Sequence, residues 1–243
     1  MSSIFNTILF QPLLNILVGF YNTVAFHDLG LSIVFLTIFI RLLLYPLFHK
    51  SMRQQRILQA LQPKIKDIQK KHADDRVKQT EAMMALYKEH GTNPFSGIGF
   101  LLLQLPVLLA LYKLFLNGLN PENLAQLYSF VHRPEFLNAT FFGLINLNEP
   151  SILLVVLAAA LQYFQGKLAL PKKHPGELSS AEKIGRQMLF IGPVLTLLIF
   201  AKLPAAVGLY WVVTSIISII QQIVVNRDTH GTKLGTIHEG ASV

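Results

Sequence analysis

The stretch 36-LTIFIRLLLYPL-47 is apolar almost throughout, but it carries Arg41 near its centre. A permanent cation in the middle of a bilayer costs about 2.5–3.5 kcal/mol even on the most favourable scales. Such a residue needs water, a polar partner or a route to the lipid headgroups. The way in which Arg41 is stabilised therefore bears directly on what the protein does.

The composition is that of an all-α integral membrane protein. Of the 243 residues, 52% are hydrophobic and only 14% are charged, and the mean hydropathy is +0.46. A soluble domain of this length carries more charge and shorter apolar runs. Several runs here reach the roughly 20 residues that cross a bilayer. The sequence has no cysteine, which excludes disulfides, thiolate metal sites and a cysteine nucleophile.

The apolar runs predict five transmembrane helices separated by polar segments. The expected order is an outer interfacial helix at 1–28, a first span at 29–49, a cytoplasmic helical hairpin at 50–93, a second span at 94–117, an outer loop at 118–150, a third span at 151–170, a cytoplasmic loop at 171–186, the fourth and fifth spans at 187–226, and a disordered cytoplasmic tail at 227–243.

Charge predicts the orientation of these spans. Segment 50–90 holds ten Lys and Arg against five acidic residues, and the 171–186 loop is also basic. The 118–150 loop holds only Arg133, and no Lys or Arg precedes Arg41. The positive-inside rule then places the hairpin and the 171–186 loop in the cytoplasm, with the N-terminus outside and the C-terminus inside.

The first 28 residues allow two interpretations. They lack the basic start and the small-residue cleavage site of a signal peptide. From Pro12 onward, apolar residues fall on one helical face, which favours a helix lying in the outer interface; this face comprises Leu13, Ile16, Leu17, Phe20, Tyr21 and Val24. The alternative is a sixth span, which would leave the N-terminus inside.

The 50–90 segment has the pattern of a helical hairpin. Ile57, Leu61, Ile65 and Ile68 follow helical steps, and 72-HADD-75 interrupts the pattern and supplies an N-cap for a second helix. One interpretation is a solvated helix pair held near anionic headgroups. The other is a surface that recruits a partner.

The spans contain no acidic residue that could pair with Arg41, because every Asp and Glu lies outside them or at their ends. Arg41 either extends to the inner headgroups or faces a water-filled cavity that is open to the cytoplasm. Thr37 lies one turn earlier on the same face and can help to line such a cavity. Gln104, Gln162 and Gln165 either line it too or hydrogen-bond between helices as packing contacts.

Four blocks of the sequence resemble the YidC-type membrane protein insertases of the YidC/Oxa/Alb superfamily. They are LQPKIKDIQKK (61–71), MMALYKEHGTNPFSG (83–97), FLLLQLPVLLALYKLF (100–115) and LPAAVGLYWVVTSIISIIQQ (203–222). Their order and spacing also fit, and the resemblance covers about residues 29–226.

The resemblance implies five core helices around a hydrophilic groove that is open to the cytoplasm and the lipid. It also implies an outer interfacial helix and a cytoplasmic hairpin. By motif position, Arg41 and Thr37 belong in the groove, and Trp211, with Tyr210 beside it, contacts passing substrate. The alternative for both aromatics is bundle packing or an interfacial belt. The substrate's apolar helix is expected to leave into lipid along the third and fifth spans.

The expected partners are nascent membrane proteins and the lipid bilayer, in a bacterial plasma membrane. A ribosome, a targeting receptor or a Sec translocon would contact the 50–93 hairpin and the 171–186 loop. The chain is expected to lack the large outer domain of many relatives, and its tail has balanced charge. No cofactor, metal or catalytic residue is expected.

Rival classes fit less well. A hydrolase needs a nucleophile with a base or metal ligands, and a proton-coupled transporter usually keeps an intramembrane acid. The spans offer neither a buried His nor an acid. A structural or chaperone-only membrane protein without insertion activity remains the alternative, because chaperoning and insertion use the same surfaces.

Overall fold

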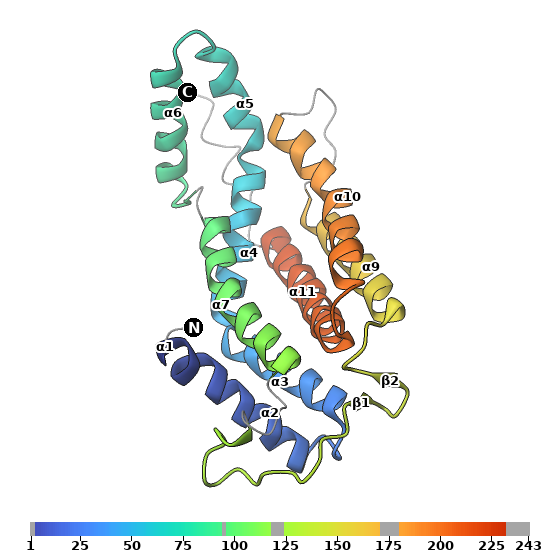
Figure 1. The fold of residues 1–243 in the computed structure, drawn as a ribbon. Helices are drawn as coiled ribbons and strands as arrows, with labels where there is room; N and C mark the ends of the chain where they lie inside the picture. Colours follow the sequence, from blue (N-terminus) through green and yellow to red (C-terminus); the bar gives the residue numbers. More distant parts are fainter. Residues whose placement is uncertain (1–2, 94–95, 118–123, 171–179, 232–243) are drawn as a thin grey trace.

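The computed structural model describes residues 3–93, 96–117, 124–170 and 180–231, and this part of the chain is almost entirely helical (Figure 1). Its elements are α1 (Ser3–Phe5), the π-helical turn η1 (Asn6–Phe10), α2 (Gln11–Thr23), α3 (Leu29–Leu43), α4 (Tyr45–Ala60), α5 (Gln62–Lys71), α6 (Arg76–Glu89), α7 (Ser96–Asn117), β1 (Thr140–Phe141), β2 (Ile145–Asn146), α9 (Ile152–Ala169), α10 (Ser180–Phe200) and α11 (Ala205–Gly231).

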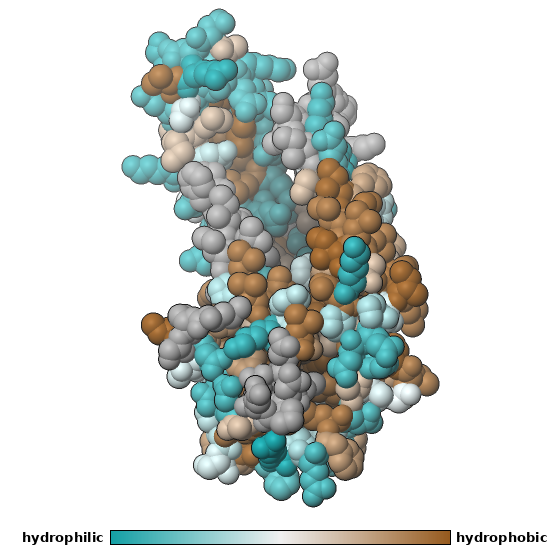
Figure 2. Space-filling view, in the orientation of Figure 1, coloured by the Kyte–Doolittle hydropathy of each residue, from teal (hydrophilic) through white to brown (hydrophobic). Residues whose placement is uncertain are grey.

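The described helices include membrane-spanning candidates of different length. Helices α9 and α11 are each long and apolar enough to cross a bilayer, and α3 with α4 passes the same test as a pair bent by 66°. Shorter apolar helical stretches lie at Gln104–Leu116 and Gly185–Phe200, within α7 and α10. Hydrophobic residues cover the visible face of α10 between the hydrophilic ends of the molecule (Figure 2). The chain is therefore a helical membrane protein.

The bend between α3 and α4 lies where the apolar run becomes polar. Leu44 has φ −91° and ψ 4°, and Pro46 lies in the first turn of α4. Proline is tolerated there because the first amide groups of a helix have no intrahelical acceptor. Helix α4 then continues unbroken to Ala60, so the predicted boundary between the first span and the hairpin falls inside a helix.

Two contacts define the start of α3. Asp28 caps the helix, since its Oδ1 accepts a hydrogen bond from the Leu31 amide at 2.8 Å, and its Oδ2 accepts one from the Phe142 amide at 2.6 Å. The Phe141 side chain covers Gly30 so closely that a Cβ there would lie 2.3 Å from the ring. These contacts join the two-stranded ribbon β1–β2 to α3. The all-α prediction did not include this ribbon.

The hairpin of α5 and α6 projects beyond α4 (Figure 1) and has a small core of its own. Leu61, Ile65 and Leu86 are its buried residues. The expected N-cap is confirmed as Asp75, whose carboxylate accepts hydrogen bonds from the Val77 and Lys78 amides at 3.1 and 3.0 Å. These bonds, led by the one from Lys78, hold the pKa of Asp75 below its usual value.

Helix α2 buries Leu13, Leu17 and Tyr21 of the predicted face, together with residues beside that face. Leu14, Leu17 and Val18 are fully buried, whereas Val24 is 46% exposed. Asn15, which the pattern placed on another face, is buried and accepts a hydrogen bond from the Tyr128 amide at 2.7 Å. Residues 3–23 are helical without a break through α1, η1 and α2, and this segment is not among the candidate spans of the described residues.

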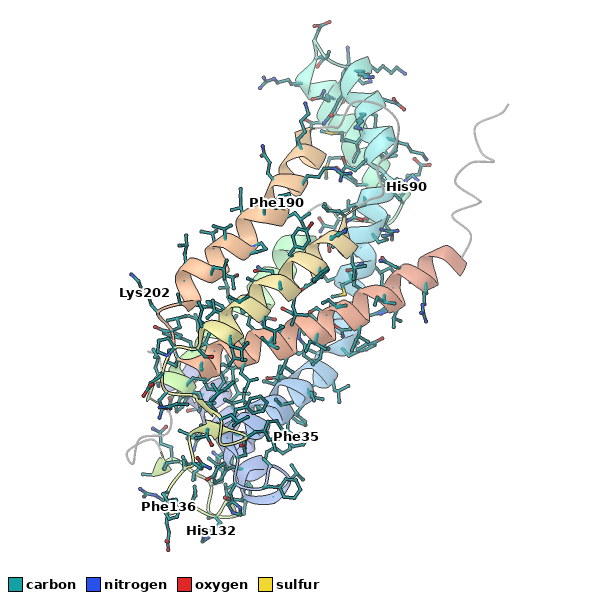
Figure 3. All side chains as sticks on the ribbon, turned by 90° about the vertical axis from the view of Figure 1, so that its right-hand side faces the viewer. Phe35, His90, His132, Phe136, Phe190 and Lys202 are labelled. Atoms are coloured by element: carbon teal, nitrogen blue, oxygen red, sulfur yellow. The ribbon has the colours of Figure 1, made fainter. Side chains whose placement is uncertain are left out.

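Helices α9 and α11 pack closely through small side chains. Ala158 and Ala159 are buried, and Gly208 faces Leu154, where an added Cβ would lie 3.3 Å from the leucine Cβ. Small residues allow close approach of helices in a membrane. Figure 3 shows the two ends of the bundle, with His90 at the hairpin end and His132 and Phe136 at the opposite end.

Candidate functional site: a polar cavity between the helices

A cavity of about 520 Å³ lies between the helices, and six of them contribute to its wall. In Figure 2 a hollow with hydrophilic residues at its back separates the side of α4 and α7 from α10. The lining residues are Arg41 of α3, Ser51, Met52, Gln55 and Gln59 of α4, Gln104 of α7, Gln162, Gln165, Gly166 and Ala169 of α9, the adjoining Leu170, Gly185, Met188, Leu189, Gly192 and Pro193 of α10, and Trp211, Thr214, Ser215, Ser218 and Gln222 of α11.

Arg41 reaches across from α3 to α11. Its side chain is 5% exposed, and its Nη2 donates to Ser218 Oγ at 2.9 Å and to the Thr214 carbonyl oxygen at 3.5 Å. The guanidinium carbon also lies 4.3 Å from the centre of the Phe48 ring, a cation–π distance. Among the described residues no carboxylate forms an ion pair with it. This burial does not fit a side chain that extends to the headgroups.

The glutamines of the cavity differ in how they are held. Gln104 Nε2 donates to the Tyr210 hydroxyl at 2.7 Å, and Gln162 Oε1 accepts from the Thr196 hydroxyl at 2.5 Å. Each of these bonds uses only part of the amide's capacity, so the rest can face the cavity. Gln165 lies on α9, three residues after Gln162 and on the same side of the helix.

Five of the seven predicted site residues line the cavity, and two do not. The five are Arg41, Gln104, Gln162, Gln165 and Trp211. Thr37 is buried and its hydroxyl donates to the Ile33 carbonyl of its own helix at 2.6 Å. Tyr210 is 2% exposed and lies behind the lining as the acceptor for Gln104. Trp211 is half-buried and packs edge-on against Phe200 at 5.1 Å.

The polar residues that α4 and α11 contribute to the cavity were not predicted from the sequence. On α11, Thr214, Ser218 and Gln222 follow one another at intervals of four residues, with Ser215 alongside. On α4, Ser51, Gln55 and Gln59 have the same spacing, and Gln59 Nε2 donates to the Ala169 carbonyl across the cavity. Steps of four mark one face of a helix, so this periodicity was an available signal.

The cavity offers one cation together with amide and hydroxyl groups. The described residues include no group of three or more His, Cys, Asp or Glu side chains that could hold a metal ion. Amides both donate and accept hydrogen bonds, and hydroxyls do the same. The arrangement is therefore suited to noncovalent binding of a polar or negatively charged chain segment within a helical membrane protein.

Comparison with known proteins gives consistent matches. The family model described as "60Kd inner membrane protein" matches residues 20–233. A protein named "Membrane protein insertase YidC" from Clostridium tetani (strain Massachusetts / E88) is 34% identical over 203 residues, which is 83% of each chain. Proteins of the same name from Magnetococcus marinus and Nitratidesulfovibrio vulgaris (strain DP4) are 34% and 31% identical over 212 residues, or 87% of this chain.

The relatives differ in length. The matched region covers 34% of the Magnetococcus protein and 37% of the Nitratidesulfovibrio protein. The chain thus spans about a third of the length of these two relatives.

Proposed function

Because the chain belongs to the 60Kd inner membrane protein family, which includes the YidC insertases, we propose that it is a membrane protein insertase and chaperone. The observation that supports this most directly is the polar cavity around the buried Arg41, because such a cavity gives hydrophilic chain a path into the membrane. Substrates are nascent membrane proteins, and the bilayer receives their apolar helices.

The proposed arrangement has five spans around a groove that opens to the cytoplasm. The bent pair α3–α4, the apolar parts of α7 and α10, and the long helices α9 and α11 supply these spans. The basic hairpin is cytoplasmic, the 124–150 segment is outside, and the chain ends in the cytoplasm of a bacterial cell. In this orientation α2 rests on the outer end of the bundle.

The mechanism is noncovalent. A groove that holds water partway into the membrane shortens the apolar distance that a hydrophilic segment must cross. Arg41 holds an acidic or polar segment while amides and hydroxyls replace part of its hydration. Burial of the substrate's apolar helix in lipid supplies about 0.8 kcal/mol per CH₂ group, and the membrane potential acts on its negative charge.

We revise the expected exit route of the substrate. The third and fifth spans correspond to α9 and α11, which pack closely through Ala158, Ala159 and Gly208. The hollow in Figure 2 instead lies between α7 with α4 on one side and α10 on the other. Helix α10 packs mainly on α9 and exposes apolar residues such as Leu198. An apolar substrate helix therefore leaves between α7 and α10.

Contacts with a ribosome, a targeting receptor or a Sec translocon are assigned to the hairpin and the 171–186 loop. The hairpin has few apolar side chains exposed and a basic surface, which fits a docking element outside the membrane. Residues 171–179 of the loop lie outside the described part of the chain.

Reconstitution tests the function. The purified chain is placed in liposomes and given a small substrate similar to a phage coat protein, and a protease is added from outside. Insertion protects the translocated segment of the substrate. Empty liposomes and liposomes with an unrelated membrane protein are the controls. Binding of substrate without protection would instead establish the chaperone-only alternative.

A further inference from the structure

The guanidinium of Arg41 keeps an unused donor inside the protein. Its Nη2 is occupied by Ser218 and Thr214, but Nη1 is equally buried and has no hydrogen-bond partner among the described residues. A buried charged group with an unmet donor is costly unless something compensates it. The Phe48 ring compensates one face of the guanidinium only.

Protein carboxylates are poorly placed to supply the missing negative charge. Helices α3, α4, α7 and α9 contain no Asp or Glu at all. Helices α10 and α11 contain one each, Glu182 and Asp228. Among the described residues no carboxylate forms an ion pair with Arg41, so its charge faces the cavity without a paired counter-charge there.

Hydroxyl groups surround the same position. Thr214, Ser215 and Ser218 of α11 all line the cavity, and Ser218 is in direct contact with Arg41. A hydroxyl can rotate to donate its hydrogen to an anion. A buried guanidinium N–H beside hydroxyl O–H groups, in a cavity wide enough to hold water as well, is the chemistry of an anion site.

We propose that the Arg41 end of the cavity binds a small monovalent anion, chloride in the cell, as an exchangeable counter-ion. The anion sits against Nη1 with the α11 hydroxyls around it. A carboxylate of a substrate segment carries the same charge and accepts the same hydrogen bonds, so it displaces the anion. This second step rests on the proposed function, whereas the anion site itself does not.

The exchange has a physical consequence for substrate choice. An acidic segment replaces one anion by another, so Arg41 never loses its counter-charge during binding. A neutral segment leaves the chloride in place and contacts the amides of Gln162 and Gln165 instead. Chloride should therefore compete with acidic segments and not with neutral ones.

Thermal unfolding of the full chain in detergent tests the site. Sodium gluconate is replaced stepwise by sodium chloride at constant ionic strength, because gluconate is too large and too hydrated to replace chloride in a buried site. A ligand that binds only the folded state raises Tm with the logarithm of its concentration above Kd. We expect a rise of about 5–11 °C between no chloride and a hundredfold excess over Kd.

Matched variants identify the site. Arg41→Gln should remove the chloride dependence, Arg41→Lys should retain it with weaker affinity, and Ser218→Ala should weaken it about tenfold. Arg53→Gln removes an exposed arginine of α4 and should behave like the unchanged protein. Line broadening of the chloride-35 NMR signal gives a direct readout of chloride binding. Sodium acetate, as a carboxylate probe, should displace the chloride and reverse this broadening.

The outcomes separate the two proposals. A chloride-independent Tm together with an unbroadened chloride signal would overturn the anion site. Water would then be the partner of the Arg41 Nη1 donor. Chloride binding that persists in Arg41→Gln would also overturn it. If the site is found but reconstituted protein protects no substrate, the insertase proposal fails and the anion site stands. If insertion occurs but the site is absent, only the anion site fails.

Discussion

Arg41 of α3 donates a 2.9 Å hydrogen bond to the hydroxyl of Ser218 on α11, although 177 residues separate them in the chain. Both side chains are almost completely buried. The contact joins a cation to a neutral partner, so it is not an ion pair. The charge of Arg41 is consequently available to a ligand in the cavity.

Replacement of Arg41 distinguishes a substrate-handling charge from a structural one. We expect Arg41→Ala to fold and to change the free energy of unfolding by less than about 2 kcal/mol, because it removes hydrogen bonds to neutral groups and a cation–π contact but breaks no ion pair among the described residues. It should reduce insertion of a substrate with an acidic translocated segment more than insertion of a neutral one. Arg41→Lys should retain much of the activity. Melting temperature and insertion are measured with the paired substrates.

Two results would contradict this prediction. A loss of about 3–5 kcal/mol in stability would indicate a broken buried ion pair. Equal loss of insertion for acidic and neutral substrates would mean that the charge of Arg41 does not select between them.

The packing of Phe141 on Gly30 predicts a large effect from one added methyl group. Gly30→Ala should destabilise the protein by about 1–3 kcal/mol, since the new Cβ would lie 2.3 to 2.6 Å from three side-chain atoms of Phe141. Gly19→Ala in α2 is the matched control, because nothing lies within 4 Å of its added Cβ. This control should be neutral or slightly stabilising. Thermal unfolding of both variants provides the comparison, and equal Tm values would refute the close contact.

The Asp75 cap predicts a pH-dependent start of α6. Its folded-state pKa is lowered by hydrogen bonds from Lys78 and Val77, so its stabilising effect is present above the unfolded pKa of about 3.9 and is lost as pH falls through the lower folded value. Asp75→Ala should speed amide exchange in the first turn of α6 at pH 7 and remove this pH dependence. Asp74→Ala, which alters an exposed neighbour, should do neither.

Topology can be tested because the chain has no cysteine of its own. Single cysteines at the exposed positions Thr7 and Asn148 should react with a membrane-impermeant thiol reagent added from outside. A cysteine at Lys71 in the hairpin should react only after the membrane is opened. Protection of the Thr7 site alone would support the alternative in which the N-terminal segment crosses the membrane. Reaction at Lys71 from outside would invert the orientation.

Local patterns were sufficient for the hairpin. The steps of three and four residues between Ile57, Leu61, Ile65 and Ile68 predicted its core, and the acidic end of 72-HADD-75 predicted the N-cap at Asp75. Both features depend on side chains within a few turns of one another. For α2 the same reasoning found only part of the buried face, because the 124–150 segment supplies partners for Asn15 and Tyr21 that no local pattern contains.

Composition and apolar patterning alone indicate a helical membrane protein, and the sequence matches the 60Kd inner membrane protein family over residues 20–233, with Arg41 in an apolar run that contains no acidic residue. Composition, apolar run length and the absence of acids from those runs are properties of the chain alone. Three-dimensional packing was needed to show that Arg41 meets Ser218, that Thr37 and Tyr210 lie outside the cavity lining, and that α9 and α11 pack closely together. Those outcomes depend on which helix faces meet, because an interhelical contact is set by packing between segments far apart in the chain.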